Sequence, residues 1–161
     1  MRSAVDLILR WHRSVDKPDL PHKLEKISLS PFGFFRGTFF LFTHDLADDF
    51  RKPKPIDATG LVIGDLHTEN YGTFRSVTGD IVYDINDFDE STTSYYEYDV
   101  RRLAVSLILA AIENKHRLGD GLNAAESAIR AWYESLALWS KFRRKQFEAA
   151  LANMKKIAEA G

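Results

Sequence analysis

The chain has 161 residues, of which 45% are hydrophobic and 28% are charged, a balance typical of a folded globular protein. Its net charge is −1 at pH 7, which gives no electrostatic reason to expect nucleic acid or an anionic membrane as a partner. No cysteine is present, so disulfides, zinc–thiolate centres and cysteine nucleophiles are excluded. The length suffices for one domain with its own core.

The apolar runs are short. The first residues lack the apolar stretch of a signal peptide, and the run from Leu103 to Ile112 is about half of what a bilayer requires. We therefore expect a cytoplasmic protein without a membrane partner.

The first elements in chain order are predicted to be helical. Apolar residues recur at helical spacing over residues 4–15, and Pro18 and Pro21 are expected to interrupt that helix. Polar and proline-containing sequence at residues 52–55 indicates a linker after the helical region.

A second helix is predicted to start at Ser30 and Pro31. Ser30 would cap the free N–H groups, and Pro31 would take the first helical position. We expect this helix to reach about Asp49 and to carry a cluster of phenylalanines into the core. Gly33 and Gly37 lie four residues apart and would allow close approach of another segment.

The middle of the chain changes to short strands. Residues 61–63 form an apolar run that ends in a loop, and residues 71–75 and 81–85 predict two further strands. Residues 76–80 between them have the composition of a turn, in which Gly79 supplies a positive φ. The strand–turn–strand unit is expected to form a hairpin.

Helical spacing returns at Asp99. Apolar residues lie on every side of the segment that ends near Ile112, which predicts a helix buried all round. Gly119 and Gly121 mark helix boundaries, and a last long helix follows. The fold class predicted from these elements is α+β, mostly helical, with a small β-hairpin sheet.

Asp65 and Asn70 are spaced like the residues of a phosphotransfer loop. Phosphoryl transfer requires a carboxylate that orients the attacking hydroxyl and accepts its proton, together with oxygen ligands for Mg²⁺. The sequence Asp65-Leu66-His67-Thr68-Glu69-Asn70 follows an apolar strand and has the spacing of the kinase catalytic loop. The pattern places a base and a metal ligand on one loop.

A second acidic motif follows the predicted hairpin. It reads Asn86-Asp87-Phe88-Asp89, and Asp87-Phe88 corresponds to the metal-binding Asp-Phe of a kinase. Because a hairpin returns the chain to its start, we expect Asn70 and Asp87 to lie close together.

These motifs resemble known families. Residues 64–70 resemble the catalytic loop of aminoglycoside phosphotransferases and choline kinases, and residues 85–89 resemble their metal-binding acidic segment. A bacterial family, domain of unknown function 2252, is the closer resemblance, on residues 30–37, 64–67 and 83–90. The resemblance covers about residues 28 to 112.

The resemblance implies a fold and a domain organisation. That bacterial family is itself similar to protein-kinase-like folds, so the hairpin sheet would carry the catalytic and metal loops of a kinase-like C-lobe. Residues 1–161 would form one catalytic-lobe domain. It would be a fragment of a longer protein that supplies the nucleotide-binding lobe elsewhere.

The resemblance also assigns roles by position. Asp65 would be the catalytic base, and Asn70 and Asp87 would be metal ligands, with Asp89 as the alternative to Asp87. Asp99 would accept backbone N–H groups of the catalytic loop, or would be a plain helix N-cap, and the two roles do not exclude each other. The implied cofactors are Mg²⁺ and ATP.

Two further residues have alternative interpretations. His67 contacts a phosphate, tunes Asp65, or only holds the loop by hydrogen bonds. Arg36 either binds substrate or phosphate, or pairs with an acid such as Asp45 or Asp89.

The predicted function is a metal- and nucleotide-dependent phosphotransferase with an unknown acceptor, either a small molecule or a protein hydroxyl. The sequence contains no GxGxxG loop and no Val-Ala-x-Lys strand, which a complete kinase requires. A metallophosphoesterase is an alternative, because Gly64-Asp65-x-His67 also opens such sites. A non-catalytic kinase-like relic or binding module is the third interpretation.

Overall fold

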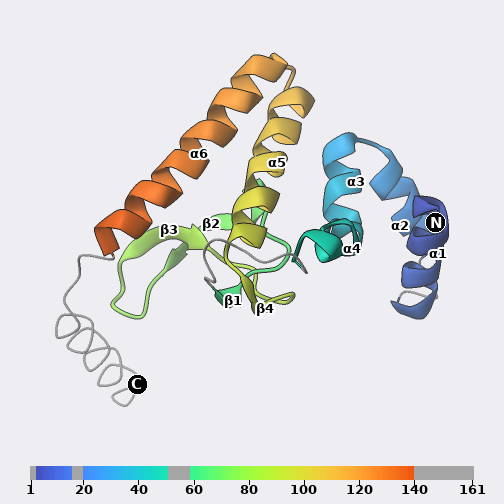
Figure 1. The fold of residues 1–161 in the computed structure, drawn as a ribbon, viewed down its shortest axis with the longest axis horizontal. Helices are drawn as coiled ribbons and strands as arrows, with labels where there is room; N and C mark the ends of the chain where they lie inside the picture. The colour runs from blue at the N-terminus through green and yellow to red at the C-terminus, as the bar shows by residue number, and fades with distance from the viewer. Residues whose placement is uncertain (1–2, 16–19, 51–58, 140–161) are drawn as a thin grey trace. The chain divides into compact units, whose positions relative to one another are not determined.

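The computed structural model describes residues 3–15, 20–50 and 59–139 (Figure 1). The chain forms two compact units, Met1–Glu126 and Ser127–Gly161. All residues assigned a functional role from the sequence lie in the first unit. The second unit is described only as the C-terminal part of one helix, and the kinase-like single-domain organisation stays a prediction.

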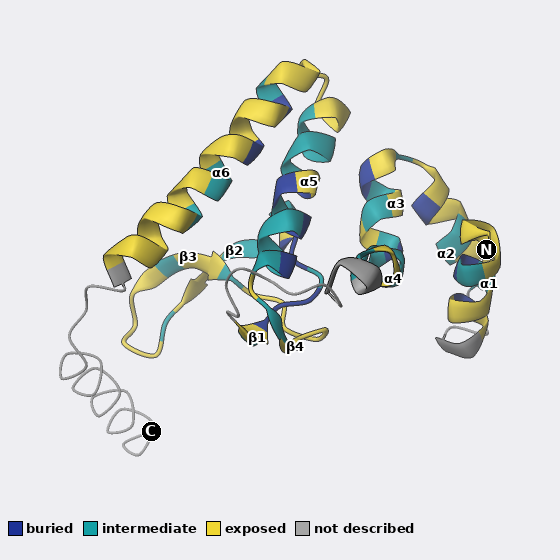
Figure 2. Ribbon diagram, in the orientation of Figure 1, coloured by how far each residue is buried: buried dark blue, intermediate teal, exposed yellow. Residues whose placement is uncertain are grey.

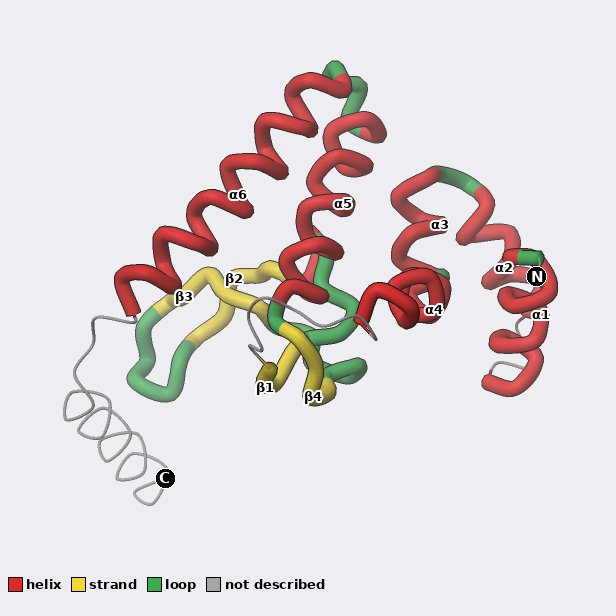
Figure 3. Tube along the Cα trace, in the orientation of Figure 1, coloured by secondary structure: helices red, strands yellow, loops and turns green. Residues whose placement is uncertain are grey.

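The described residues form an α+β structure that is mostly helical, as predicted (Figure 3). The helices are α1 (Ala4–Val15), α2 (Leu20–Ser28), α3 (Pro31–Gly37), α4 (Phe39–Phe50), α5 (Glu97–Glu113) and α6 (Leu118–Trp139). The strands are β1 (Thr59–Val62), β2 (Tyr71–Arg75), β3 (Ile81–Ile85) and β4 (Thr92–Tyr95), and a 3₁₀ turn covers Thr68–Asn70. No described helix is both long and apolar enough to cross a membrane.

The predicted start of the second helix is confirmed. Ser30 has extended backbone (φ −151°), and its hydroxyl accepts a hydrogen bond from the Gly33 N–H at 3.0 Å, with Pro31 at the first helical position. The prediction of one continuous helix to Asp49 is wrong, because the helix breaks at Thr38. There the Thr38 hydroxyl donates to the Phe34 carbonyl at 2.6 Å, so a side chain competes with the backbone ladder.

The N-terminal helices contact one another closely. Helix α1 matches the predicted residues 4–15, whereas Pro21 lies in the first turn of α2 and does not end a helix. Pro18 and the predicted linker at residues 52–55 lie outside the described residues. A Cβ atom at Gly37 would overlap the Ile27 side chain of α2, so this glycine allows the predicted close approach.

The strands form two separate antiparallel pairs. Strands β2 and β3 pair from Tyr71↔Ile85 to Arg75↔Ile81, and Gly79 in their turn has a φ of +91°, as predicted. Strand β1 pairs with β4, and β4 itself was not predicted from the sequence. Beyond the hairpin, the Asn86 N–H donates to the Asn70 carbonyl at 2.9 Å, so the acidic motif begins beside the end of the loop that carries Asp65 and Asn70.

Many of the buried positions lie on α5 and on the loop and helix that contact it (Figure 2). The prediction that α5 is buried all round is wrong, since Val105 and Ile112 are 37% and 44% exposed. The phenylalanine cluster is also less buried than predicted, with Phe32 in the core and Phe34 42% exposed. Instead, α5 buries two polar side chains, Arg102 and Ser106, completely. Those two residues connect the fold to the candidate site.

Candidate active site

The loop between β1 and β2, residues 63–70, lies along one face of α5. Three polar side chains of the helix, Asp99, Arg102 and Ser106, are spaced three and four residues apart and therefore share that face. Each contacts a different part of the loop. The loop that carries the predicted base is thus positioned by side chains of one helix.

Asp99 holds the start of this loop. Its two carboxylate oxygens accept hydrogen bonds from the Ile63 N–H at 2.7 Å and the Gly64 N–H at 3.0 Å. Burial raises the pKa of Asp99, and these two backbone hydrogen bonds oppose that rise. Helix α5 is capped at Tyr96 without a side-chain hydrogen bond, so the Asp99 carboxylate serves the loop and is not the N-cap of its own helix.

Ser106 holds the far end of the loop. Its hydroxyl oxygen accepts a hydrogen bond from the Thr68 N–H at 3.2 Å, and the same hydroxyl donates a hydrogen bond to the Leu103 carbonyl at 2.7 Å. Ser106 has no exposed surface, so this contact is shielded from water.

Arg102 contacts the predicted base directly. Its Nε donates to Asp65 Oδ1 at 2.8 Å, and its Nη2 donates to the same oxygen and to the Phe35 carbonyl at 3.0 Å. The guanidinium lies 4.1 Å from the centre of the Phe35 ring, a cation–π contact. This fully buried arginine therefore joins the loop to α3.

Asp65 is held through one of its two oxygens. Oδ2 makes no hydrogen bond to the described part of the chain, whereas Oδ1 takes both bonds from Arg102. Burial raises the pKa of Asp65, and the positive charge and hydrogen bonds of Arg102 oppose the rise. The carboxylate is fixed in orientation and keeps one oxygen available.

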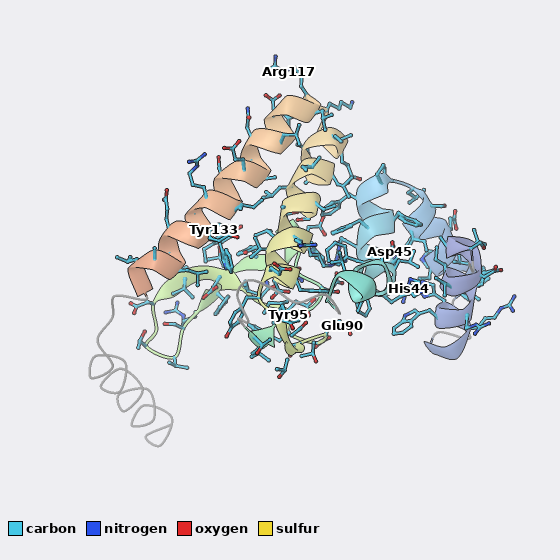
Figure 4. The ribbon with its side chains drawn as sticks, viewed as in Figure 1. His44, Asp45, Glu90, Tyr95, Arg117 and Tyr133 are labelled. Atoms are coloured by element: carbon cyan, nitrogen blue, oxygen red, sulfur yellow. The ribbon has the colours of Figure 1, made fainter. Side chains whose placement is uncertain are left out.

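Gly64 joins the loop to the acidic segment. Its φ is +87°, a conformation that side-chain-bearing residues rarely adopt, and a Cβ atom there would overlap the Glu90 carbonyl. Only glycine therefore permits both the turn into Asp65 and the contact with Glu90, which is labelled in Figure 4.

Asn70 closes the 3₁₀ turn of the loop. Its side-chain oxygen accepts a hydrogen bond from the His67 N–H at 2.7 Å, and its own N–H donates to the His67 carbonyl at 3.0 Å. An amide oxygen has two lone pairs, so one remains for a further partner. Asn70 is buried, which fixes the direction of this amide.

His67 is buried within the loop, with 3% of its surface exposed. Its Nε2 accepts a hydrogen bond from Arg36 Nε at 3.2 Å, which assigns the ring proton to Nδ1. Burial, followed by the positive charges of Arg36 and Arg102, lowers the pKa of His67 to about 4. The ring is therefore neutral near pH 7.

Arg36 extends this contact to the surface. It forms an ion pair with Glu69, and not with Asp45 or Asp89 as the sequence had suggested. It also lines a pocket of about 580 Å³ together with Glu69 and Glu113.

The acidic segment, residues 86–91, is exposed along its whole length. Its shape comes from local turns, in which the Asp89 N–H donates to Asp87 Oδ1 at 3.3 Å and the Ser91 N–H donates to the Phe88 carbonyl at 3.0 Å. Neither Asp87 nor Asp89 forms an ion pair with a described residue.

The two regions meet at one small pocket of about 160 Å³. Its lining residues are Ile63, Asp65, Asn70, Asp87, Asp89 and Glu90. The structure thus brings together all four residues that the sequence assigned as base or metal ligand. His67, Asp99 and Arg36, the predicted support or substrate residues, do not line this pocket.

The donors at this pocket are carboxylate and amide oxygens, the ligand type that Mg²⁺ prefers. Among the described residues, no three carboxylate or imidazole groups are arranged to hold a metal ion by themselves. Mg²⁺ is commonly bound by one or two carboxylates, with water and phosphate oxygens completing its coordination. The residues present fit that mode of binding.

Arg102, Ser106 and Glu90 were missed as contributors to the site. A signal for the first two existed, because both interrupt an apolar helical pattern on the same face as Asp99. Glu90 was included only as the last residue of the matched segment 83–90 and was given no role, and it directly precedes the residues where the unpredicted β4 pairs with β1.

The protein is therefore an α+β chain with an acidic, oxygen-lined pocket. The pocket lies beside the loop of residues 63–70, which side chains of α5 hold in place. A family model described as "Uncharacterized protein conserved in bacteria (DUF2252)" matches residues 15–160. The chain belongs to this family, as its motifs predicted. Searches of curated proteins and of solved structures found no match.

Proposed function

We propose that this chain carries the base and metal-binding half of a metal- and nucleotide-dependent phosphotransferase. One observation supports the proposal above the others. Asp65, Asn70, Asp87 and Asp89 come from separate stretches of the sequence and line the same small pocket. A base and metal ligands must lie within a few ångströms of each other for phosphoryl transfer to a hydroxyl.

Asp65 is the proposed general base. Arg102 fixes Oδ1, so Oδ2 is the oxygen that accepts the proton of the attacking hydroxyl. The raised pKa of Asp65 favours this role, because a carboxylate with a higher pKa is a stronger base. Asp99 and Ser106 act as positioning residues, since they hold the loop on which Asp65 lies.

Asn70 and Asp87 are the proposed ligands of Mg²⁺, with Asp89 as the alternative to Asp87. Asn70 retains one lone pair on its side-chain oxygen, and both aspartates are exposed at the pocket. Bound there with ATP, Mg²⁺ would neutralise charge on the phosphate groups. The likeness to a kinase C-lobe belongs to this proposal.

The nucleotide-binding elements of a kinase are proposed to lie outside these residues, since the sequence contains neither the GxGxxG loop nor the strand lysine. The acceptor is a hydroxyl of a small molecule or a protein. The proposed location is the cytoplasm, where ATP is available.

The geometry disfavours a metallophosphoesterase. That function would require His67 as a metal ligand beside Asp65. The His67 ring is buried, its Nε2 already accepts a hydrogen bond from Arg36, and it does not line the acidic pocket.

The proposal is tested on the full-length family member that contains this chain. Mg²⁺-dependent ATP turnover is measured for the wild type and for Asp65→Asn, and we expect a loss of about 10²–10⁴-fold from removal of the base. Asp80→Asn is the control, because Asp80 lies in the exposed β2–β3 turn away from the pocket.

Asp87→Asn adds a second measurement that does not depend on the acceptor. Calorimetry should show Mg²⁺-coupled ATP binding that Asp87→Asn weakens and Asp80→Asn leaves unchanged. If ATP binds without any Mg²⁺ dependence, or if Asp65→Asn turns over like the wild type, the phosphotransferase proposal is wrong. If the protein is folded but binds no nucleotide, the result favours the third interpretation, a non-catalytic kinase-like relic or binding module.

A further inference from the structure

Helix α3 contacts the loop of residues 63–70 through the ring of His67. Arg36 Nε donates to His67 Nε2 at 3.2 Å, and the Phe32 ring packs edge to face against the same imidazole, with 6.2 Å between the ring centres. Phe32 and Arg36 are four residues apart and therefore share one side of α3. Two side chains of this helix thus hold one ring of the loop.

The polar contact of this ring depends on Arg36. His67 is buried, and its Nδ1 has no hydrogen-bond partner among the described residues. Within the described part of the chain, the bond from Arg36 Nε is therefore the one hydrogen bond that the imidazole makes. A buried polar group that loses its partner is costly, so removal of this donor favours a different position of the ring.

His67 in turn orients Asn70, the proposed metal ligand. The His67 N–H donates to the Asn70 side-chain oxygen at 2.7 Å, and the His67 carbonyl accepts from the Asn70 N–H at 3.0 Å. A shift of His67 therefore moves the donor that fixes the direction of the Asn70 amide at the acidic pocket. Residues that orient a metal ligand influence the affinity for the metal although they do not touch it.

The second contact of Arg36, the ion pair with Glu69, lies at the surface. The two side chains are 44% and 55% exposed, so water weakens the attraction between them. The two contacts also use different nitrogens of Arg36, Nε for His67 and Nη1 for Glu69. Substitutions can therefore remove one contact and keep the other.

We propose that Arg36 is a positioning residue for the metal ligand Asn70 and acts through the imidazole of His67. The inference rests on the proposed function in one respect, that Asn70 binds a divalent cation. Arg36 does not line the acidic pocket and so acts at a distance from it. Its Nε–H holds the His67 ring, and the backbone of His67 holds the Asn70 amide.

Two substitutions separate the Nε–H donor from the charge of Arg36. In Arg36→Gln the side-chain amide nitrogen takes the place of Nε, because both nitrogens are bonded to the δ carbon, whereas Arg36→Met has a methyl group at that place. Both variants lose the guanidinium that pairs with Glu69, and both change the net charge equally. Glu69→Gln is the matched control, since it removes the ion pair and leaves Arg36 intact.

The first measurement is a Mg²⁺ titration of the full chain, followed by the ¹H–¹⁵N NMR signals of the Asn70 side-chain amide. We expect Arg36→Met to bind Mg²⁺ about tenfold more weakly than Arg36→Gln. Glu69→Gln should remain within about threefold of the wild type, because salt screens exposed charges. The second measurement needs no metal, since the ¹⁵N shifts of the His67 ring show which nitrogen carries the proton. It should be Nδ1 in the wild type and in Arg36→Gln, and Arg36→Met should lose this preference.

Equal Mg²⁺ affinity of Arg36→Met and Arg36→Gln would overturn the inference, as would an unchanged His67 tautomer in Arg36→Met. If Arg36→Met does not fold, the wild type decides, because a proton on Nε2 of its His67 ring would show that Arg36 does not donate there. No Mg²⁺ response at Asn70 in the wild type would reject the metal site together with this inference. A wild-type response with equal affinities in the two variants would reject the inference alone.

Discussion

The two sides of the acidic pocket are built in different ways. The loop of residues 63–70 is held by the half-buried Asp99 and the buried Arg102 and Ser106 of α5, which contact it at Ile63, Asp65 and Thr68. The acidic segment, residues 86–91, is exposed and is shaped by local turns and by backbone contacts at its ends. One side is fixed by tertiary packing and the other by short-range hydrogen bonds.

This difference fits the roles proposed for the two sides. A general base must be held in one orientation before the substrate arrives, because its effect depends on geometry. Carboxylates that await a cation repel each other less when water surrounds them, since the effective dielectric constant there is high. Exposed Asp87 and Asp89 can therefore lie near Asp65 at little cost.

The largest expected effect comes from removing the buried charge that fastens the loop. Arg102→Met leaves the Asp65 carboxylate without its ion-pair partner and should lower the free energy of unfolding by about 3–5 kcal/mol. Urea unfolding followed by circular dichroism measures this loss.

Two controls test the contrast between the sides. Arg101→Met removes the neighbouring arginine, whose ion pair with Glu97 is partly exposed, and should cost less than about 1 kcal/mol. Asp87→Asn, in the exposed acidic segment, should cost less than about 0.5 kcal/mol. If Asp87→Asn destabilises the protein as much as Arg102→Met, the two sides are not built differently.

A second effect is a loss of stability in mild acid caused by His67. Its pKa falls from 6.5 to about 4 on folding, so the unfolded chain binds more protons between these values and stability declines as the pH falls through that window. At about 1.36 kcal/mol per pKa unit, the full decline amounts to about 3 kcal/mol.

The measurement compares the free energy of unfolding at pH 7 and pH 4.5 in the wild type and in His67→Gln. Asp65 and Asp99 have raised pKa values, so their contribution just above pH 3.8 has the opposite sign and is common to both proteins. The decline should be smaller in His67→Gln. An equal decline in both proteins would show that the His67 ring is not the titrating group.

The sequence predicted the elements whose signals are local. The Ser30 cap, the turn at Gly79 and strands β2 and β3 each depend on residues within a few positions, and all of them are confirmed. The predicted hairpin also implied that Asn70 and Asp87 would lie close together, and both residues line one pocket. Spacing within a short segment was enough for these features.

The remaining features depend on contacts between distant segments. The break at Thr38 follows from a side-chain hydrogen bond that competes with the helix, and β4 exists because it pairs with β1. Arg102 was passed over because a buried arginine contradicts the usual preference of charged residues for water. The burial of Arg102 is explained by its hydrogen bond to Asp65 and its contact with the Phe35 ring, which the spacing of residues in the sequence does not reveal.

The smallest expected effect isolates the contact between the two sides. Gly64 and Gly79 both have positive φ, but a Cβ atom at Gly64 would overlap the Glu90 backbone, whereas one at Gly79 would meet open space. Gly79→Ala should therefore cost about 1 kcal/mol for its backbone conformation alone. Gly64→Ala should cost about 2–3 kcal/mol, because the overlap adds to the same conformational strain. Urea unfolding of the two variants gives the difference directly, and equal costs would show that the acidic segment does not pack against the loop at Gly64.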